Sequence, residues 1–260
     1  MYIAILIIFI LALGFTVVKL QKKKPVKAGP IPESYRAMLA EHVPFYQQLN
    51  ETKQKEFEER VQHFLAQVKI TGVKTMVEDI DRVLIAASAV IPIFNFAGWE
   101  YANLHEVLLY PDSFDHEFEQ QGAGRNILGM VGSGAMNHMM ILSQNELRDA
   151  FINKTGKGNV GIHEFVHLVD KTDGSIDGVP SAILDKKYIM PWLQLMQKEM
   201  ELIRDDRSDI NPYGATNESE FFAVVAEYFF ERPELLKEKH PELYELLGKI
   251  FSEPATEKNL

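Results

Sequence analysis

The chain has 260 residues, a formal net charge of −10 at neutral pH and no cysteine. This acidic balance argues against nucleic acid as the main partner, because the phosphate backbone attracts basic surfaces. Without cysteine the fold has no disulfide, and no thiolate can act as a nucleophile or a metal ligand.

The chain begins with a long apolar run. Residues 2–18 carry no charged side chain, and as a helix they nearly cover a hydrocarbon core of roughly 30 Å. No basic residue precedes the run and no clear Ala-x-Ala cleavage site follows it, so residues 1–20 are predicted to be a transmembrane anchor. Five lysines follow between positions 19 and 27, and by the positive-inside rule they place the rest of the chain in the cytoplasm. The expected location is therefore the cytoplasmic membrane, with a single span; the alternative is export after signal cleavage.

After this run the composition changes twice. Residues 21–32 form a basic linker with Pro and Gly, and residues 33–260 have the composition of one globular domain. Helices are expected at residues 51–68, 78–90, 159–171, 181–203 with a break or kink at Pro191, 217–231, and in two short pieces opening at Pro233 and Pro241; strands are expected at 104–110 and 139–142. Few strands among many helices predict a mainly helical α+β domain with a small β-sheet.

A His-Glu-x-x-His pattern occurs at His163, Glu164 and His167. On a helix, positions i and i+4 lie one above the other, so both imidazoles can reach a single zinc ion. Glu164 projects about 100° away from His163, where it can take a proton from a water rather than bind the metal. The alternative is a helix that carries two histidines by chance.

A catalytic zinc needs a third protein ligand, which is sought downstream. Glu220 and Glu227 lie on one face of the predicted helix at 217–231, in a stripe otherwise suited to burial. A buried carboxylate needs a partner, and a metal is one. Glu220 also fits a capping box with Asn217, in which its side chain would only reach back to the cap. Spacing alone leaves ligand and cap equally open.

These motifs resemble two groups of known proteins. The His-Glu-Phe-Val-His run, together with the Tyr213 to Phe222 run, resembles the protease domain of anthrax lethal factor. It is still more similar to the bacterial zinc peptidases typified by Mlc titration factor A, over roughly residues 40 to 250. The residues that extend the second resemblance are Leu104 to Pro111, Gly178 to Pro180 and Glu227 to Phe230.

The second resemblance implies a zincin-like zinc peptidase domain over residues 33–260. It implies one Zn²⁺ held by His163, His167 and Glu220, with Glu164 as general base and Tyr213 as a hydrogen-bond donor to the transition state. Glu227 then has a supporting or structural role.

Asp170 follows His167 by three residues on the same predicted helix, so it is a candidate to accept a hydrogen bond from a ligand imidazole. The alternative is a carboxylate in water at the helix end. The segments Gly122 to Asn137 and Asp205 to Asp209 do not match the family pattern, so substrate specificity does not transfer.

Two functions remain open. The first is a membrane-anchored zinc peptidase that acts on a peptide or protein substrate. The second is a regulatory protein that retains the zinc site with little activity and binds a partner, for which the family resemblance suggests a transcriptional regulator. Glu164 favours the enzyme, because a purely structural zinc does not need a base beside its first ligand.

Overall fold

The computed structural model describes residues 29–114, 127–132, 136–153 and 155–252. The predicted anchor at residues 1–20 lies outside these residues, as does most of the predicted linker. Within the described ranges, no helix combines the length and the apolar character that a membrane crossing requires.

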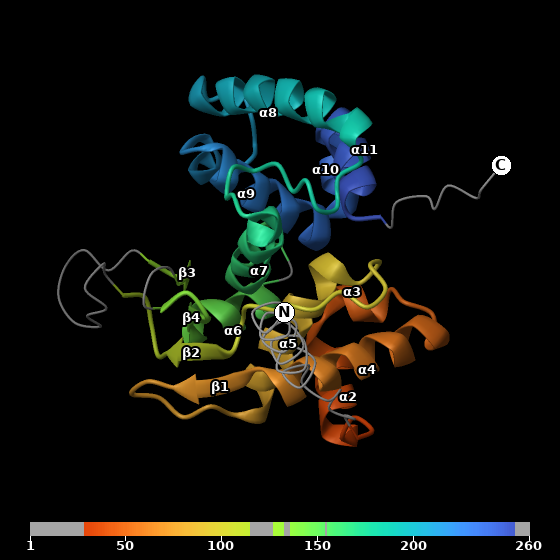
Figure 1. The fold of residues 1–260 in the computed structure, drawn as a ribbon, viewed down its shortest axis with the longest axis vertical. Helices are drawn as coiled ribbons and strands as arrows, with labels where there is room; N and C mark the ends of the chain where they lie inside the picture. Colours follow the sequence, from red (N-terminus) through yellow and green to blue (C-terminus); the bar gives the residue numbers. More distant parts are fainter. Residues whose placement is uncertain (1–28, 115–126, 133–135, 154, 253–260) are drawn as a thin grey trace, which may run out of the picture.

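The described chain forms two halves that meet at one helix (Figure 1). One half holds a β-sheet with the N-terminal helices, the other holds the C-terminal helices, and α7 lies between them. The helices are α2 (Glu33–His42), α3 (Pro44–Gln47), α4 (Glu51–Gln67), α5 (Asp79–Ile93), α6 (Gln144–Ile152), α7 (Val160–Asp170), α8 (Ile189–Arg204), α9 (Glu218–Glu231), α10 (Pro233–Lys239) and α11 (Pro241–Ile250), with short 3-10 turns η2 (Lys171–Asp173), η3 (Lys186–Tyr188) and η4 (Pro212–Ala215). A mainly helical α+β fold with a small sheet is confirmed.

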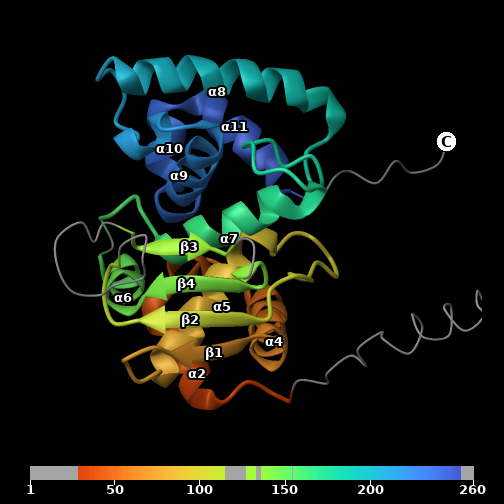
Figure 2. The same cartoon turned by 60° about the vertical axis from the view of Figure 1, so that its left-hand side comes forward.

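The sheet has four strands in the order β1-β2-β4-β3. They are β1 (Lys69–Gly72), β2 (Glu106–Tyr110), β3 (Gly129–Val131) and β4 (Met139–Ser143). The first three in this order run parallel, and β3 pairs antiparallel with β4. Because β3 closes one side of the sheet, it is the strand that lies next to α7 (Figure 2).

The two faces of the sheet bury different residues because side chains alternate along a strand. Val107 and Met140, which are paired in register, join the main hydrophobic core with the helices. Tyr110 and Ile141 point to the other face and pack in a small separate cluster with Phe114. The main core therefore lies between the sheet and the helices.

Helix α7 is fixed at both its start and its buried face. The Asn159 side chain caps it by accepting from the Ile162 amide, and Phe165 and Val166 are fully buried. Gly161 lies where a Cβ would meet the Ser88 hydroxyl of α5 at 2.3 Å. Only glycine allows α5 and α7 to approach this closely, so the position of α7 is set by its contact with the sheet half.

Most of the predicted elements are confirmed within a few residues, and one is wrong in part. The helix expected at 181–203 begins only at Ile189, and residues before it form turns and η3. Pro191 lies in the first turn of α8 and does not break a helix. Backbone amides in the first turn have no acceptor within the helix, so a proline there costs no hydrogen bond. The sequence reasoning did not predict α2, α3, α6, β1 and β3.

Candidate metal centre

Helices α7 and α9 bring three ligand atoms to one point. His163 Nε2 lies 3.1 Å from His167 Nε2 and 3.0 Å from Glu220 Oε2, and His167 Nε2 lies 3.4 Å from the same oxygen. This set is the one group of histidine and acidic side chains in the described chain that could hold a metal ion. The two histidines come from successive turns of α7, and Glu220 comes from the first turn of α9.

The spacing of these atoms fits zinc. Ligands about 2.0–2.1 Å from a tetrahedral ion lie about 3.3 Å from one another, close to the three observed separations. Two histidines and one carboxylate leave one position of the tetrahedron open, which is the arrangement of catalytic rather than structural zinc sites. The donor set therefore suits zinc.

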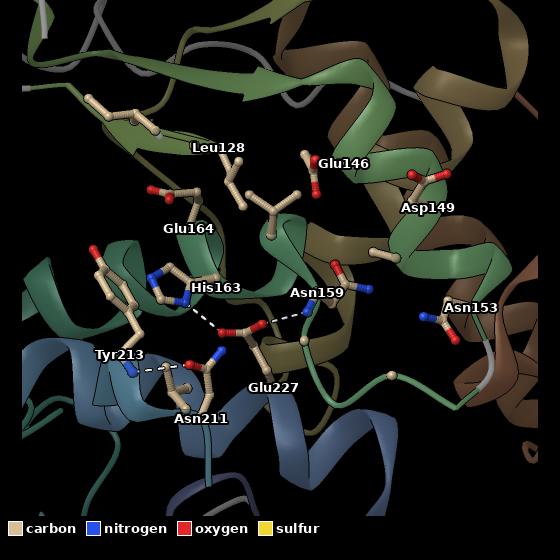
Figure 3. A pocket seen from close by; sticks show the side chains of 17 residues that line it. Leu128, Glu146, Asp149, Asn153, Asn159, His163, Glu164, Asn211, Tyr213 and Glu227 are labelled. Carbon is tan, nitrogen blue, oxygen red and sulfur yellow. Dashed lines mark hydrogen bonds and ion pairs between the residues drawn. The ribbon is translucent and has the colours of Figure 1, made fainter. Parts of the chain in front are cut away.

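Outer partners orient both imidazoles. His163 Nδ1–H donates to Glu227 Oε1 at 2.6 Å (Figure 3). This leaves the Nε2 lone pair to face His167 Nε2 and Glu220 Oε2. The Ser219 hydroxyl lies 3.0 Å from His167 Nδ1. Glu227 also accepts from the backbone amide of Asn159, the cap of α7. Glu227 therefore holds both the ring and the start of its helix.

Charge in the cluster favours a cation. Burial would lower the pKa of His163, but Glu227 and Glu220 raise it well above its usual value. Burial would likewise raise the pKa of Glu220, but hydrogen bonds with His163 and His167 hold it down to about 2. A proton on an imidazole takes the place of positive charge that a metal would otherwise supply, so the site is electrostatically ready for a divalent ion.

The two roles left open for Glu220 are now separated by geometry. Asn217 does cap α9, since its side chain accepts from the Glu220 amide at 2.9 Å. The Glu220 carboxylate, however, turns to the two imidazoles. The backbone amide of Glu220 takes part in the cap while its side chain stays available as a ligand.

Glu164 lies beside the cluster in a different environment. It is 5 % exposed, lines a cavity together with His163, and burial raises the pKa of its carboxyl. No other described residue makes a hydrogen bond or ion pair with its carboxylate. Gly129 of β3 packs against it so closely that a Cβ there would lie 2.7 Å from Glu164 Oε1.

Tyr213 lies on η4, which begins after Asn211, whose side chain accepts from the Tyr213 amide. Its ring centroid is 6.0 Å from that of His163, and it is 52 % exposed. Burial of the phenol and the nearby Glu220 raise its pKa, so the hydroxyl keeps its proton at neutral pH. In Figure 3 this hydroxyl points toward the Glu164 end of the cavity.

The structure gives Asp170 a contact that differs from the expected one. Both imidazole Nδ1 atoms face Glu227 and Ser219, and Asp170 instead accepts from the Gly178 amide at 2.8 Å. Asp170 is fully buried, and burial raises its pKa to about 6. Its position at the last turn of α7 directs it to the loop that follows, not to the ligand face. Sequence reasoning missed Ser219, for which the pattern holds no distinctive signal.

A cavity of about 660 Å³ opens beside the cluster. His163, Glu164 and Tyr213 line one end of it, and β3 and α6 contribute further walls (Figure 3). A cavity of this size holds one or more amino-acid side chains. The buried carboxylate of Glu164, the phenol of Tyr213 and the candidate metal ligand His163 therefore line one space large enough for a substrate.

The fold and this site define a class: an α+β protein in which a histidine helix and a downstream carboxylate can hold a catalytic metal. The chain belongs to the glucose-regulated metallo-peptidase M90 family, whose sequence profile matches residues 17–252. A metal, most consistent with zinc from the donor set, is thereby expected at His163, His167 and Glu220.

Known relatives span most of the chain. An uncharacterized protein of Synechocystis sp. is 30% identical over 245 residues, covering 88% of this chain and 87% of its own length. Mlc titration factor A of Pectobacterium atrosepticum is 28% identical over 226 residues, covering 80% and 82%. The same-named protein of Escherichia coli is 27% identical over 225 residues, covering 81% and 83%. The expected resemblance to the Mlc titration factor A group is confirmed, and the resemblance to anthrax lethal factor stays a prediction.

Proposed function

We propose that this chain is a zinc-dependent peptidase of the zincin type that uses Glu220 as third ligand, the gluzincin arrangement. The observation that carries the proposal is the buried carboxylate of Glu164, which faces a substrate-sized cavity beside three converging ligand atoms. A structural metal site has four protein ligands and no adjacent base. Membership of a metallo-peptidase family supports the same reading.

In the proposed reaction each side chain has one task. Zinc, when bound, supplies a Lewis acid that acidifies water and polarises the peptide carbonyl. Glu164 takes the proton of the attacking water, and its buried position favours the protonated form that then gives the proton to the leaving amine. The neutral hydroxyl of Tyr213 donates to the carbonyl oxygen as negative charge develops there.

Strand β3 gives the substrate a place to bind. Among the described strands it lies at the edge of the sheet, and a Cβ at its Gly129 would meet Glu164. An extended peptide that pairs with β3 passes the general base, because sheet edges offer unpaired backbone groups. The absence of a Cβ at Gly129 keeps this passage open.

The test is hydrolysis of a mixed peptide library by the full chain, followed by mass spectrometry with and without a zinc chelator. Glu164→Gln is expected to keep its metal and to lower turnover by about 10²-fold or more. Glu201→Gln, an exposed position on α8, is the control and should behave as wild type. Activity of Glu164→Gln close to wild type would refute the general base.

Membrane anchoring is a further part of this proposal. It is supported by the uncharged run at residues 2–18 and the lysines behind it, since an apolar run of this length in lipid satisfies its backbone only as a helix. The peptidase domain then faces the cytoplasm. Cell fractionation with protease protection of spheroplasts tests both statements. A mature protein without its first residues that is digested from outside would contradict them.

A second candidate function rests on the names of the relatives. Several are called Mlc titration factor A, and we propose as the alternative that this chain binds a transcriptional regulator and has little peptidase activity. Wild-type protein that retains zinc, cleaves no peptide and co-purifies with such a regulator would favour it over the enzyme.

A further inference from the structure

One end of the cavity is not used by the chemistry described above. His163, Glu164 and Tyr213 occupy the metal end, whereas the opposite end is formed by α6 and the loop after it (Figure 3). Glu146 and Asp149 of α6 line this far end. A substrate side chain that extends from the metal centre into the cavity would contact these two carboxylates.

The acidic pair belongs to one face of α6. Glu146, Asp149, Ala150 and Asn153 follow the i, i+3, i+4, i+7 spacing that places side chains on one side of a helix, and all four line the cavity. Glu146 in the first turn also suits the helix dipole, but this does not account for Asp149 one turn later.

Neither carboxylate has a charged partner among the residues that the structure describes. Within the described chain, no hydrogen bond or ion pair reaches the side chain of Glu146 or Asp149. Arg148, which lies between them in sequence, turns away and pairs with Asp81 at 2.7 Å. No described Lys or Arg lines the cavity. As far as the described residues show, the acidic end therefore offers acceptor oxygens to a positive group.

Apolar side chains contribute to the walls of the cavity. Leu128 comes from the segment before β3, Val160 from the start of α7 and Val224 from α9, and each of them lines the same cavity. A cavity with apolar side chains in its walls and two carboxylates at one end matches a long aliphatic stem with a cationic head. Lysine and arginine have this form, whereas aliphatic and acidic side chains match only one part or neither.

The buried carboxylate of Glu164, at the metal end, indicates separately that a ligand enters this cavity. It is more than nine-tenths buried, has no polar partner among the described residues and faces the cavity. A carboxylate in this state needs something to complete its hydrogen bonds. The acidic pair on α6 lines the same cavity.

We propose that the α6 end of this cavity is a specificity subsite for a lysine or arginine side chain next to the cleaved bond, with Glu146 and Asp149 as its cation-binding residues. The proposal rests on the proposed peptidase function and adds the substrate class. Apolar lining holds the methylene groups, and the two carboxylates receive the ammonium or guanidinium donors.

The first test compares peptides that differ in charge and little in shape. Two pairs of otherwise identical peptides carry arginine or citrulline, and lysine or norleucine, at each position beside the cleaved bond. The charged member of each pair should be cleaved with kcat/KM at least about 10-fold higher at one position, the scale of a hydrogen-bonded charged contact. Equal values at every position would overturn the subsite.

The second test changes the protein. Glu146→Gln with Asp149→Asn should bring the arginine-to-citrulline ratio close to one, and Asp149→Asn alone, at an exposed position, should lower it in part without risk to the helix start. Glu201→Gln should keep the wild-type ratio. An unchanged ratio in the double variant would also refute the proposal.

A binding measurement separates this proposal from the proposed function. Zinc-loaded Glu164→Gln is titrated with the same arginine and citrulline peptides, each carrying a fluorescent label. If wild type cleaves no peptide, the peptidase function fails, but tighter binding of the arginine peptide than of the citrulline peptide would still support the subsite. Cleavage without any preference for charge would leave the peptidase function intact and reject the subsite.

Discussion

Replacing Glu227 by glutamine should weaken zinc binding without removing a ligand. In the structure one carboxylate oxygen accepts from His163 Nδ1–H at 2.6 Å and the other accepts from the Asn159 amide. Glutamine has one carbonyl oxygen, so its amide nitrogen must face one of these two donors. The glutamine N–H group therefore faces either His163 Nδ1–H or the Asn159 amide and cannot accept from it. Either the His163 ring or the start of α7 loses its hydrogen bond.

The magnitude follows from the role of the contact. Loss of a carboxylate that orients a metal-binding histidine typically costs about 10–100-fold in metal affinity, which corresponds to about 1.4–2.8 kcal/mol at a factor of 10 per 1.4 kcal/mol. Glu227→Gln should lie toward the upper end of this range, because the same substitution also disturbs the cap of the helix that carries both histidines.

The assay is competition for zinc against a chromophoric chelator, with folding checked by circular dichroism. Glu231→Gln is a matched control: it lies one turn further along α9 and accepts from the Asn159 side chain at 2.8 Å but does not contact His163. It should change zinc affinity much less. Wild-type affinity in Glu227→Gln would refute the orienting role, and loss of zinc there with retention in Glu220→Gln would exchange the two assignments.

Three further outcomes are expected. Gly129→Ala should lower peptide turnover by about 10²-fold with zinc retained, because the new methyl displaces Glu164; Gly248→Ala, where a Cβ meets nothing within 4 Å, should not. Tyr213→Phe should lower kcat more than it raises KM, and the reverse would place the hydroxyl in ground-state binding. Hydrogen bonds from Lys157 and His240 hold the pKa of Asp209 well below its usual range despite partial burial, so Asp209→Asn should lower the melting temperature at pH 7. That difference should close as pH falls below about 4, since a depressed carboxyl pKa stabilises the fold only above the unfolded value, and a constant difference from pH 7 to pH 2 would contradict it.

The sequence was sufficient where the signal is local. The spacing of His163 and His167 determines which face they share once a helix forms, so α7 and its ligands were predictable. The spacing did not determine the third ligand. Glu220 and Glu227 lie on the same face of α9, so the sequence alone allows either of them to be the metal ligand or the partner of a ligand histidine. Only the packing of α9 against α7 shows which carboxylate reaches the Nε2 atoms and which reaches Nδ1.

The elements that were missed depend on distant partners. Strands β1 and β3 are four and three residues long, too short to show an alternating pattern of their own. They form because β1 pairs with β2 and β3 pairs with β4. The late start of α8 reflects Pro191, which suits a first turn as well as a kink. Ser219 became visible as a partner of His167 only when both helices were placed.

The candidate metal ligands come from both halves of the molecule. His163 lies on the helix that Gly161 fastens to the sheet half, whereas Glu220 lies 57 residues further along, in the C-terminal helices. An ion bound to both residues would cross-link the two parts of the chain and close a loop that contains α8. Gain of metal during maturation would therefore mark the moment when the C-terminal helices have docked, and a polypeptide that has not completed this step would have no active centre.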